Sequence, residues 1–498
     1  ALAGTSGITV NGAIFAAADY NLAAALTLNA SATATISAAG LNISGAITNA
    51  GTATDALNFS ASTGTITLAS LSGAGKTTFG AAATITGGVS VGVVTVAGAL
   101  TSAITGGTVN AGSLAGNVSA GTVTVTNLIT GDVTGGTVNA GSLAGNVSAG
   151  AVTLSGLLTG NVLAGSGAVS AGSMTGDVGS SVTVSGLLTG AITLGTNALG
   201  SLSSTSVTGG TNTITGAATV ATVNGGTTTV GGVANITTLT TGTINLNGAS
   251  GSIGTLTDGT FNLNGAVATV GTLTAGTINL AAATALTVDS GTFGGSLTGS
   301  GSLIKATTGI LTLTGANTFG GGVTIAANGG TVIAGHSNAL GTGTVTLAGN
   351  NAQLTLVDGI TVANSLNLTN TGGLQARTLR LQTGATSATY AGPISNSSAN
   401  TSSLTLTFSA EASGTLIISG NISGKGFVKT GAGTVSLSGA NTYTGETTVS
   451  AGTLTAATGS LAGTLGIAVN DAVLSAVNYN LAATLALNAS ATATISAA

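Results

Sequence analysis

The sequence has no cysteine and no tryptophan, and it has a single proline and a single histidine among 498 residues. Without cysteine the chain can form no disulfide framework, thiolate metal site or cysteine nucleophile, and its redox compartment is not indicated. One histidine alone cannot supply the His or Cys cluster that binds zinc. The sequence therefore predicts no metal site and no cofactor.

Charged residues are equally scarce, because six Lys and Arg and ten Asp and Glu make up only 3% of the chain. About a quarter of an ordinary soluble domain is charged. So few basic residues cannot form the positive surface that nucleic acid requires, and nucleic acid is excluded as a partner. No apolar run approaches the roughly 18 residues of a membrane-spanning helix. The chain opens without a signal region, so we expect any targeting signal to have been removed or to lie outside these residues.

What the sequence has instead is 84 glycines and 43% hydrophobic residues, arranged in short apolar runs that recur in repeats. Residues 134–150 repeat residues 105–121 (TGGTVNAGSLAGNVSAG) without change, 29 positions later. The same register continues through three related segments, VTVTNLITGDV, VTLSGLLTGNV and VTVSGLLTGAI, which begin at Val123, Val152 and Val182. Residues 105–192 therefore repeat with a period of 29 or 30.

A shorter period, of 16 or 17, runs through residues 220–285, in VATVNGGTTTV, ITTLTTGTINL, IGTLTDGTFNL and VGTLTAGTINL. Apolar residues alternate within a unit, so Ile244 and Leu246 face inward and the polar residues beside them face outward. Each unit is too small to bury its own apolar face and must stack on its neighbours. A sandwich or propeller would need variable cores and aromatic anchors. The sequence predicts an all-β protein, one continuous β-solenoid over residues 1–498 with coils of about 17–30 residues.

The longest repeat links the two ends of the sequence. Residues 460–498 copy residues 1–39, with 28 identities in 39 positions. This pattern predicts a window of a longer repetitive protein, in which one long unit is followed by the opening of the next. The alternative interpretation is a single molecule with duplicated ends that act as caps.

Residues 424–454 (GKGFVKTGAGTVSLSGANTYTGETTVSAGTL) resemble the passenger-associated transport repeat of bacterial autotransporters. Residues 299–347 resemble a second copy. Five residues of this copy precede their counterparts by 124 positions: Lys305, Gly315, Asn317, Thr318 and Phe319, against Lys429, Gly439, Asn441, Thr442 and Tyr443. The resemblance implies a right-handed parallel β-helix at the surface of a Gram-negative cell, exported across the outer membrane with a translocating outer-membrane barrel as its partner. It supplies no activity.

Two motifs come close to catalytic or binding signatures. Ser70–Thr78 (SLSGAGKTT) is similar to a phosphate-binding loop, but it lacks the first glycine and the helix that should follow Lys76. We expect Lys76 to lie beside a turn and to bind no nucleotide. Gly335–Ala339 (GHSNA) departs from the nucleophile elbow at its last position, and His336 adjoins the serine that it would have to activate. We expect His336 to be an ordinary loop residue.

The acidic residues are scattered singly, which argues against the paired carboxylates of a polysaccharide-cleaving β-helix and against a Ca²⁺ site. Stacking of coils could bring Asp132 and Asp177 together, so a catalytic pair of these two carboxylates stays an open alternative. The ordinary interpretation is that each is an aspartate next to a turn glycine. Thr-x-Asn triplets that begin at Thr243, Thr260 and Thr277 leave an ice-binding face open, beside the ordinary interpretation of polar ladders that satisfy outward-facing groups. We expect no catalytic, cofactor-binding or metal-binding residues.

These observations lead to a functional hypothesis with one main alternative. The first is an extracellular structural protein at the bacterial cell surface, which forms a fibre, sheath or stalk by end-to-end stacking of β-solenoids or by covalent continuation of the repeat. Its partners are then copies of itself end to end. The alternative is an autotransporter-like adhesin for attachment to cells or surfaces. An enzyme would need a carboxylate or Ser-His cluster that this composition scarcely permits, so we expect none.

Overall fold

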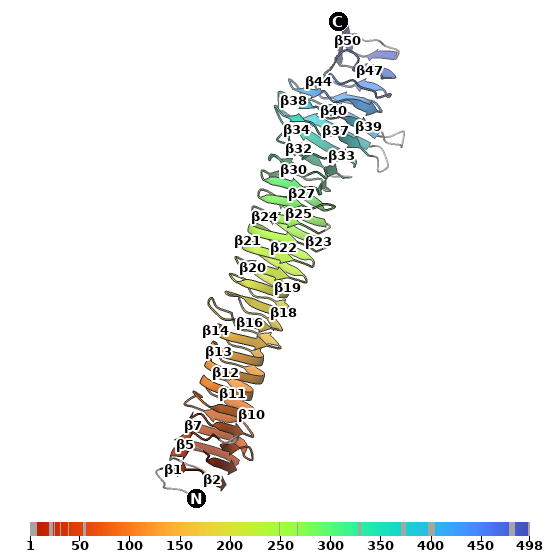
Figure 1. Ribbon diagram of the computed structural model, residues 1–498. Coiled ribbons are helices and arrows are strands. Elements are labelled where there is room, and N and C mark those ends of the chain that lie inside the picture. The colour runs from red at the N-terminus through yellow and green to blue at the C-terminus, as the bar shows by residue number, and fades with distance from the viewer. Residues whose placement is uncertain are drawn as a thin grey trace. The chain divides into compact units, whose positions relative to one another are not determined.

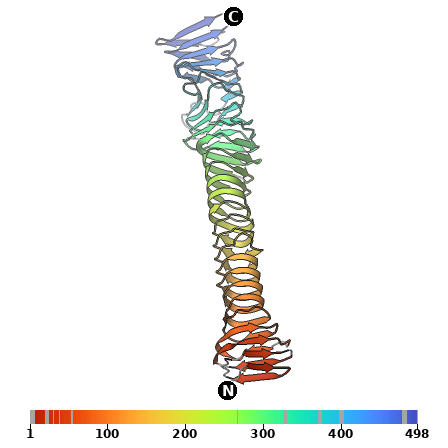
Figure 2. The ribbon, with the colours of Figure 1, turned by 90° about the vertical axis from the view of Figure 1, so that its left-hand side faces the viewer.

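The computed structural model describes residues 7–18, 23, 25–29, 31–37, 39–52, 56–248, 250–265, 267–326, 330–369, 375–396, 404–477 and 484–496. They form a parallel β-solenoid of about 25 turns, which confirms the all-β solenoid that the repeats predict (Figure 1). Strands succeed one another as rungs in both views (Figures 1 and 2). These described residues contain no helix, and so none that is long and apolar enough to cross a membrane.

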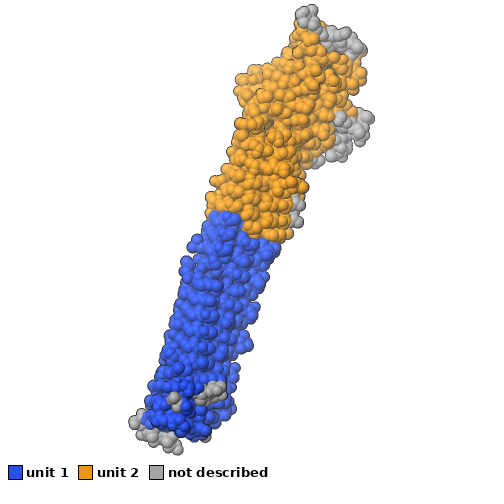
Figure 3. Space-filling model, in the orientation of Figure 1, with its two compact units in different colours: residues 1–221, 225–228 blue, residues 222–224, 229–498 orange. Residues whose placement is uncertain are grey.

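The chain divides into two compact units (Figure 3). Unit 1 comprises residues 1–221 and 225–228, and unit 2 comprises residues 222–224 and 229–498. The core of each unit follows from the alternation of apolar and polar residues along each strand. In unit 1, for example, Val133, Val138 and Leu143 of strand β13 (Val133–Leu143) are fully buried, whereas Thr137 is exposed.

Within unit 1, the coils of residues 105–192 are shorter than the sequence predicts. Val109 in β11 (Ile104–Ala115) pairs with Val123 in β12 (Val118–Ile129), and Val123 pairs with Val138 in β13. These partners lie 14 and then 15 positions apart, so two coils together account for the period of 29. The two halves of a repeat have different letters but place Thr, Val and Gly in equivalent positions, so both halves close the same turn of backbone.

The coils of unit 2 have the expected length. Ile236 pairs with Ile253 and Ile253 with Val270, which gives a coil period of 17. Later coils are longer, and Leu366 pairs with Ile394, 28 positions farther along the chain. A second, seven-stranded parallel sheet runs through these later coils. It consists of β35 (Thr361–Val362), β38 (Ser387–Tyr390), β41 (Thr415–Ile418), β44 (Thr434–Leu437), β46 (Thr453–Ala456), β48 (Val473–Val477) and β50 (Thr492–Ser496).

The two copies of the longest repeat have the same local structure where they are described. Strands β1 (Gly7–Val10), β2 (Ile14–Ala18), β3 (Ala25–Leu28) and β4 (Thr33–Ser37) correspond to β47 (Gly466–Asn470), β48, β49 (Thr484–Asn488) and β50. The pairing Gly7 with Ala25 recurs as Gly466 with Thr484. The sequence repeat is therefore also a structural repeat of two coils.

Candidate functional site

The segment similar to a phosphate-binding loop is a strand, a turn and a second strand. It joins β7 (Thr63–Ser72) to β8 (Lys76–Phe79), and no helix follows Lys76. The side chain of Asn49 fills the turn, because its Nδ2 donates to the carbonyl oxygen of Lys76 at 2.9 Å and to Thr77 Oγ1 at 3.1 Å. The backbone of this turn therefore forms hydrogen bonds to a neighbouring coil and does not form a phosphate-binding loop.

The segment similar to a nucleophile elbow is also a turn between coils. Nδ1 of the exposed His336 accepts the N–H of Asn338 at 3.0 Å, and the Oγ of Ser337 accepts the N–H of Thr361 at 3.1 Å. Both side chains thus fix the backbone of their own turn or of the next coil. The arrangement does not place His336 as a base for Ser337.

Asp132 and Asp177 do lie in one column, but not side by side. Their column is a ladder in which each side-chain Oδ1 accepts the backbone N–H of the equivalent residue one coil later, at 2.7 to 2.8 Å. The ladder runs through Asn117, Asp132, Asn146, Asn161 and Asp177, and ends on the N–H of Ala191. Two asparagines separate the carboxylates by three coil spacings, or roughly 14 Å. That separation is too long for a glycosidase pair.

Each of these Asx residues belongs to a corner with the pattern Gly-Asx-Val. The valines stack as a buried ladder, in which Val147 pairs with Val162 and Val162 with Val178. The glycines let consecutive corners touch, because a Cβ on Gly160 would lie 1.9 Å from the carbonyl oxygen of Gly145. This corner recurs in each coil from Gly116 to Val178, and its glycine, its Asx side chain and its valine each contact the neighbouring coil.

The Thr-x-Asn triplets form a similar ladder in unit 2. Nδ2 of Asn262 donates to Oδ1 of Asn245 at 2.6 Å, and Nδ2 of Asn279 donates to Oδ1 of Asn262. Asn245 in turn donates to Thr229 Oγ1 at 3.1 Å. These amides therefore satisfy one another from coil to coil, as stacked polar residues on a parallel sheet can.

The two lysines shared by residues 299–347 and 424–454 are fully buried inside the solenoid. Lys305 ends β29 (Ser302–Lys305), and its Nζ donates to the carbonyl oxygen and the Oγ1 of Thr307. Lys429 lies in β43 (Phe427–Thr430), and its Nζ donates to three carbonyl oxygens, those of Thr430 at 2.8 Å, Gly431 at 2.6 Å and Ala451 at 2.9 Å. Since Ala451 is in the next coil, Lys429 ties two coils together.

Burial lowers the pKa of both lysines. Burial lowers the pKa of Lys429 to about 8, against the opposing effect of the Glu411 carboxylate. Burial also lowers the pKa of Lys305, while Asp289 opposes the shift. A lysine so enclosed is available neither to solvent nor to an external ligand, so both act as internal donors to the backbone.

The shared asparagine makes the same contacts in both segments. Oδ1 of Asn441 accepts the N–H of Ile422 in the preceding coil, and its Nδ2 donates to the carbonyl oxygen of Ser460 in the next coil, both at 2.8 Å. Oδ1 of Asn317 accepts the N–H of Leu297 at 2.8 Å, and its Nδ2 donates to the carbonyl oxygen of Ala339 at 2.7 Å. One buried amide therefore holds three consecutive coils in register.

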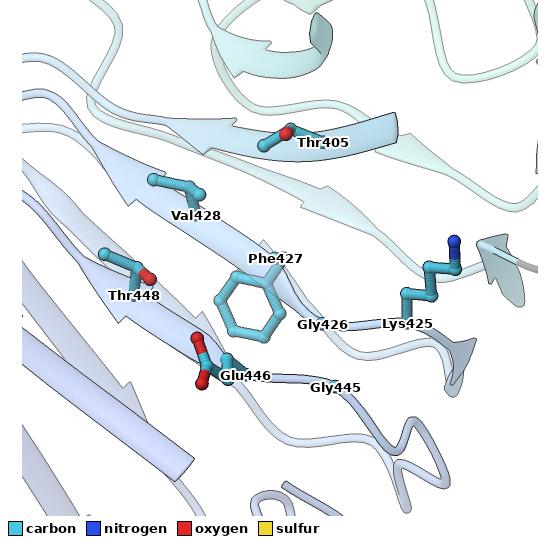
Figure 4. Close-up of a pocket in the computed structure, with 8 residues that line it drawn as sticks. All are labelled: Thr405, Lys425, Gly426, Phe427, Val428, Gly445, Glu446 and Thr448. Atoms are coloured by element: carbon cyan, nitrogen blue, oxygen red, sulfur yellow. The ribbon is translucent and has the colours of Figure 1, made fainter. Parts of the chain in front are cut away.

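A shallow surface hollow of about 280 Å³ lies beside the second of these segments (Figure 4). Figure 4 shows the side chains of Lys425 and Glu446 apart from each other, on successive coils. Within the described part of the chain, no three His, Cys, Asp or Glu residues come together to hold a metal ion. The hollow is lined by Thr405, Lys425, Gly426, Phe427, Val428, Gly445, Glu446 and Thr448.

The passenger-associated transport repeat family matches the chain at residues 303–334 and 427–456, the same two segments in which the lysine and asparagine contacts recur. The chain thus contains two passenger-associated transport repeats. Among curated proteins, the chain is similar to the adhesin BmaC autotransporter of Brucella suis biovar 1 (strain 1330), with 33% identity over 198 residues. The match covers 38% of the chain and 5% of that relative. No solved structure matches it significantly.

The family match confirms the two transport repeats that the sequence predicts. The sequence identifies Lys305, Lys429, Asn317 and Asn441 as parts of this motif but does not predict their contacts. Two signals in the sequence point to their burial: each lysine falls on the inward phase of its strand, and each asparagine recurs at the same distance from its lysine. In this chain the lysines and asparagines of the motif form hydrogen bonds to the backbone inside the β-solenoid.

Proposed function

We propose that this chain is part of a surface-exposed or secreted adhesin of a Gram-negative bacterium, carried as an autotransporter passenger. The two transport repeats and the similarity to an autotransporter adhesin support the proposal. Because the chain spans only about 5% of that relative, the adhesive role of the whole protein is part of the proposal. An outer-membrane barrel would be the partner for export.

The proposed role needs no chemistry from the chain. The catalytic candidates Ser337 and His336, and the carboxylates Asp132 and Asp177, are used in contacts between coils. The buried polar groups of the transport repeats likewise act on the backbone. We therefore propose a binding and structural role and no enzymatic one.

Surface display tests the adhesin proposal. Residues 1–498 fused to an outer-membrane barrel are displayed on a non-adherent Gram-negative host, and attachment to matrix-coated surfaces and cultured epithelial cells is counted. We expect several-fold more attachment than with the barrel alone, and loss of the gain when external protease removes the passenger. Display without any gain in attachment would contradict the adhesin role, and failure of the chain to reach the surface would contradict the passenger role.

A second candidate function is a fibre, sheath or stalk built by end-to-end stacking or by covalent continuation of the repeat. The observation in its favour is that the copies at 1–39 and 460–498 share their strands and register. The mass of the fully denatured native chain tests covalent continuation. A mass well above 45.9 kDa is the expected result. A mass near that value would contradict the continuation and leave only stacking of separate subunits.

A further inference from the structure

A column of small hydroxyl residues follows the buried valine ladder of unit 1, one residue later in each coil. Five of its hydroxyls donate to a carbonyl oxygen of the preceding coil at 3.0 to 3.4 Å, as Thr134 does to Val118 and Thr193 to Val178. The pairing of the valine ladder places these residues in the column: Ser90, Thr105, Ser119, Thr134, Ser148, Leu163, Gly179, Thr193 and Thr208. Leu163 and Gly179 alone among these nine carry no hydroxyl, and they are neighbours.

The backbone does not require a glycine at position 179. Gly179 has no positive φ, and a Cβ there would meet its nearest atoms, Ala164 N and Val162 O, at 3.2 Å. The corner glycines of the same unit would place a Cβ about 2 Å from a carbonyl oxygen, as Gly176 does at 2.0 Å. Unlike the corner glycines, Gly179 is not needed for close approach of two coils, and its missing side chain leaves space on the surface.

That space is a hollow of about 290 Å³, which we call the Gly179 hollow. Leu163 and Leu194 flank it from the coils on either side of Gly179, and 45% and 55% of their surfaces are exposed. These two leucines are separated by two coil spacings, or roughly 10 Å, which is about the room that one large side chain needs. The hollow is lined by Asn161, Val162, Leu163, Ala164, Asp177, Gly179, Thr193 and Leu194.

The edge of the hollow carries one negative charge. Asp177 is exposed, and its Oδ1 accepts a hydrogen bond from the N–H of Ala191 at 2.8 Å. Among the described residues, the ion pair within 4.0 Å involves Arg380 and Glu411 in unit 2 and not Asp177. An apolar hollow beside an exposed carboxylate is complementary to an apolar group that is followed by a cation.

We propose that the Gly179 hollow binds a leucine-sized or phenylalanine-sized side chain of a partner polypeptide, with an adjacent basic residue paired with Asp177. The inference rests on the proposed adhesin function, for which it names the chemistry of the partner. A polypeptide fits because the hollow is open and shallow and holds one side chain, whereas a small ligand is normally enclosed by most of its surface.

The chain supplies matched variants that keep the fold. Gly179→Thr restores the residue type of the column, and its hydroxyl can donate to Val162 as Thr193 donates to Val178. Leu163→Ser removes one wall and also restores the column. Asp177→Asn removes the charge and keeps the hydrogen bond of the ladder, because Asn146 and Asn161 each accept the equivalent N–H of the following coil.

The experiment measures binding of the peptides Gly-Leu-Lys-Gly and Gly-Leu-Glu-Gly to the full chain by methyl NMR of Leu163 and Leu194. We expect both methyl signals to shift with the lysine peptide, and the glutamate peptide to bind about tenfold more weakly. Gly179→Thr and Leu163→Ser should each weaken the lysine peptide at least about tenfold, and Asp177→Asn should make the two peptides equal. No shift with the lysine peptide, or equal binding to Gly179→Thr, would overturn the inference.

The display assay separates this inference from the proposed function. If displayed wild type attaches and Gly179→Thr attaches equally well, the hollow is not the adhesive contact and the adhesin role stands. If attachment falls several-fold in Gly179→Thr while the thermal unfolding of the purified variant is unchanged, the inference is supported. If the displayed wild type fails to attach, the proposed function fails, whatever the peptides do.

Discussion

Replacing Lys429 with methionine is expected to loosen the second transport repeat by about 3 kcal/mol, because the part-buried carbonyl oxygens of Thr430, Gly431 and Ala451 lose their donor. Methionine fills a similar volume, so the loss comes from unsatisfied acceptors and not from a cavity. Coils of a solenoid need not unfold together, so native-state hydrogen exchange of β43 and β45 (Thr447–Val449) is the suitable measurement.

Lys425→Met is the control for this variant. Lys425 precedes the same strand and is only half-buried, so the loss there should be well under that of Lys429→Met. Unchanged exchange of β43 and β45 in Lys429→Met would show that the buried ammonium does not hold these two coils together.

The pH dependence of the same amides gives a second prediction for Lys429. Its pKa is about 8 in the folded chain against an ordinary value of 10.5, so between these values the unfolded chain binds the proton and the folded chain does not. The free energy of unfolding should therefore rise with pH from about 8, since burial then no longer opposes a charge. Burial raises the pKa of Tyr443 to about 12 from 10.0, so stability should fall again above about pH 10. Lys429→Met should remove the rise and keep the fall.

Much of the fold could be predicted from the sequence because successive coils of a solenoid place similar residues in equivalent positions. Ile236, Ile253 and Val270 occupy one position in successive units, and the structure pairs them directly. In the same way, the copies at 1–39 and 460–498 have the same strands and register where they are described. The position of a residue in its repeat determines which residue of the next coil it contacts. Identical residues at equivalent positions therefore make the same contacts.

The coil length of residues 105–192 and the role of the polar residues could not be predicted in this way. Repetition of letters gave a period of 29, but the backbone needs only an inward valine, a corner glycine and a hydrogen-bonding residue to close a turn, and both halves of the repeat supply these. Asp132 and Asn146 look different in sequence, yet both present Oδ1 to the next coil. A period read from sequence identity therefore overestimates the coil length wherever chemically different residues form the same contacts.

Gly160→Ala tests this account of the corner and should have an effect as large as that of Lys429→Met. A Cβ at position 160 would lie 1.9 Å from the carbonyl oxygen of Gly145, so the two coils would have to move apart. Hydrogen bonds hold them together on either side, from Asn161 N to Asn146 Oδ1 and from Val147 N to Asn161 O, both at 2.8 Å. Losing both hydrogen bonds and the packing of the two coils should cost about 3 kcal/mol, seen as faster exchange of the Asn161 and Val147 amides.

Gly179→Ala is the matched control, because it adds the same methyl group in the same unit at a position where the nearest atoms are 3.2 Å away. We expect its exchange to change by less than about 1 kcal/mol, since a shift of a few tenths of an ångström accommodates it. Equal losses in the two variants would mean that any added methyl group weakens these coils, and the corner would then be no special point of contact. A loss confined to Gly160→Ala would identify close approach at the corner as the constraint that keeps glycine in every Gly-Asx-Val turn, and would separate those glycines from Gly179, whose missing side chain opens the surface.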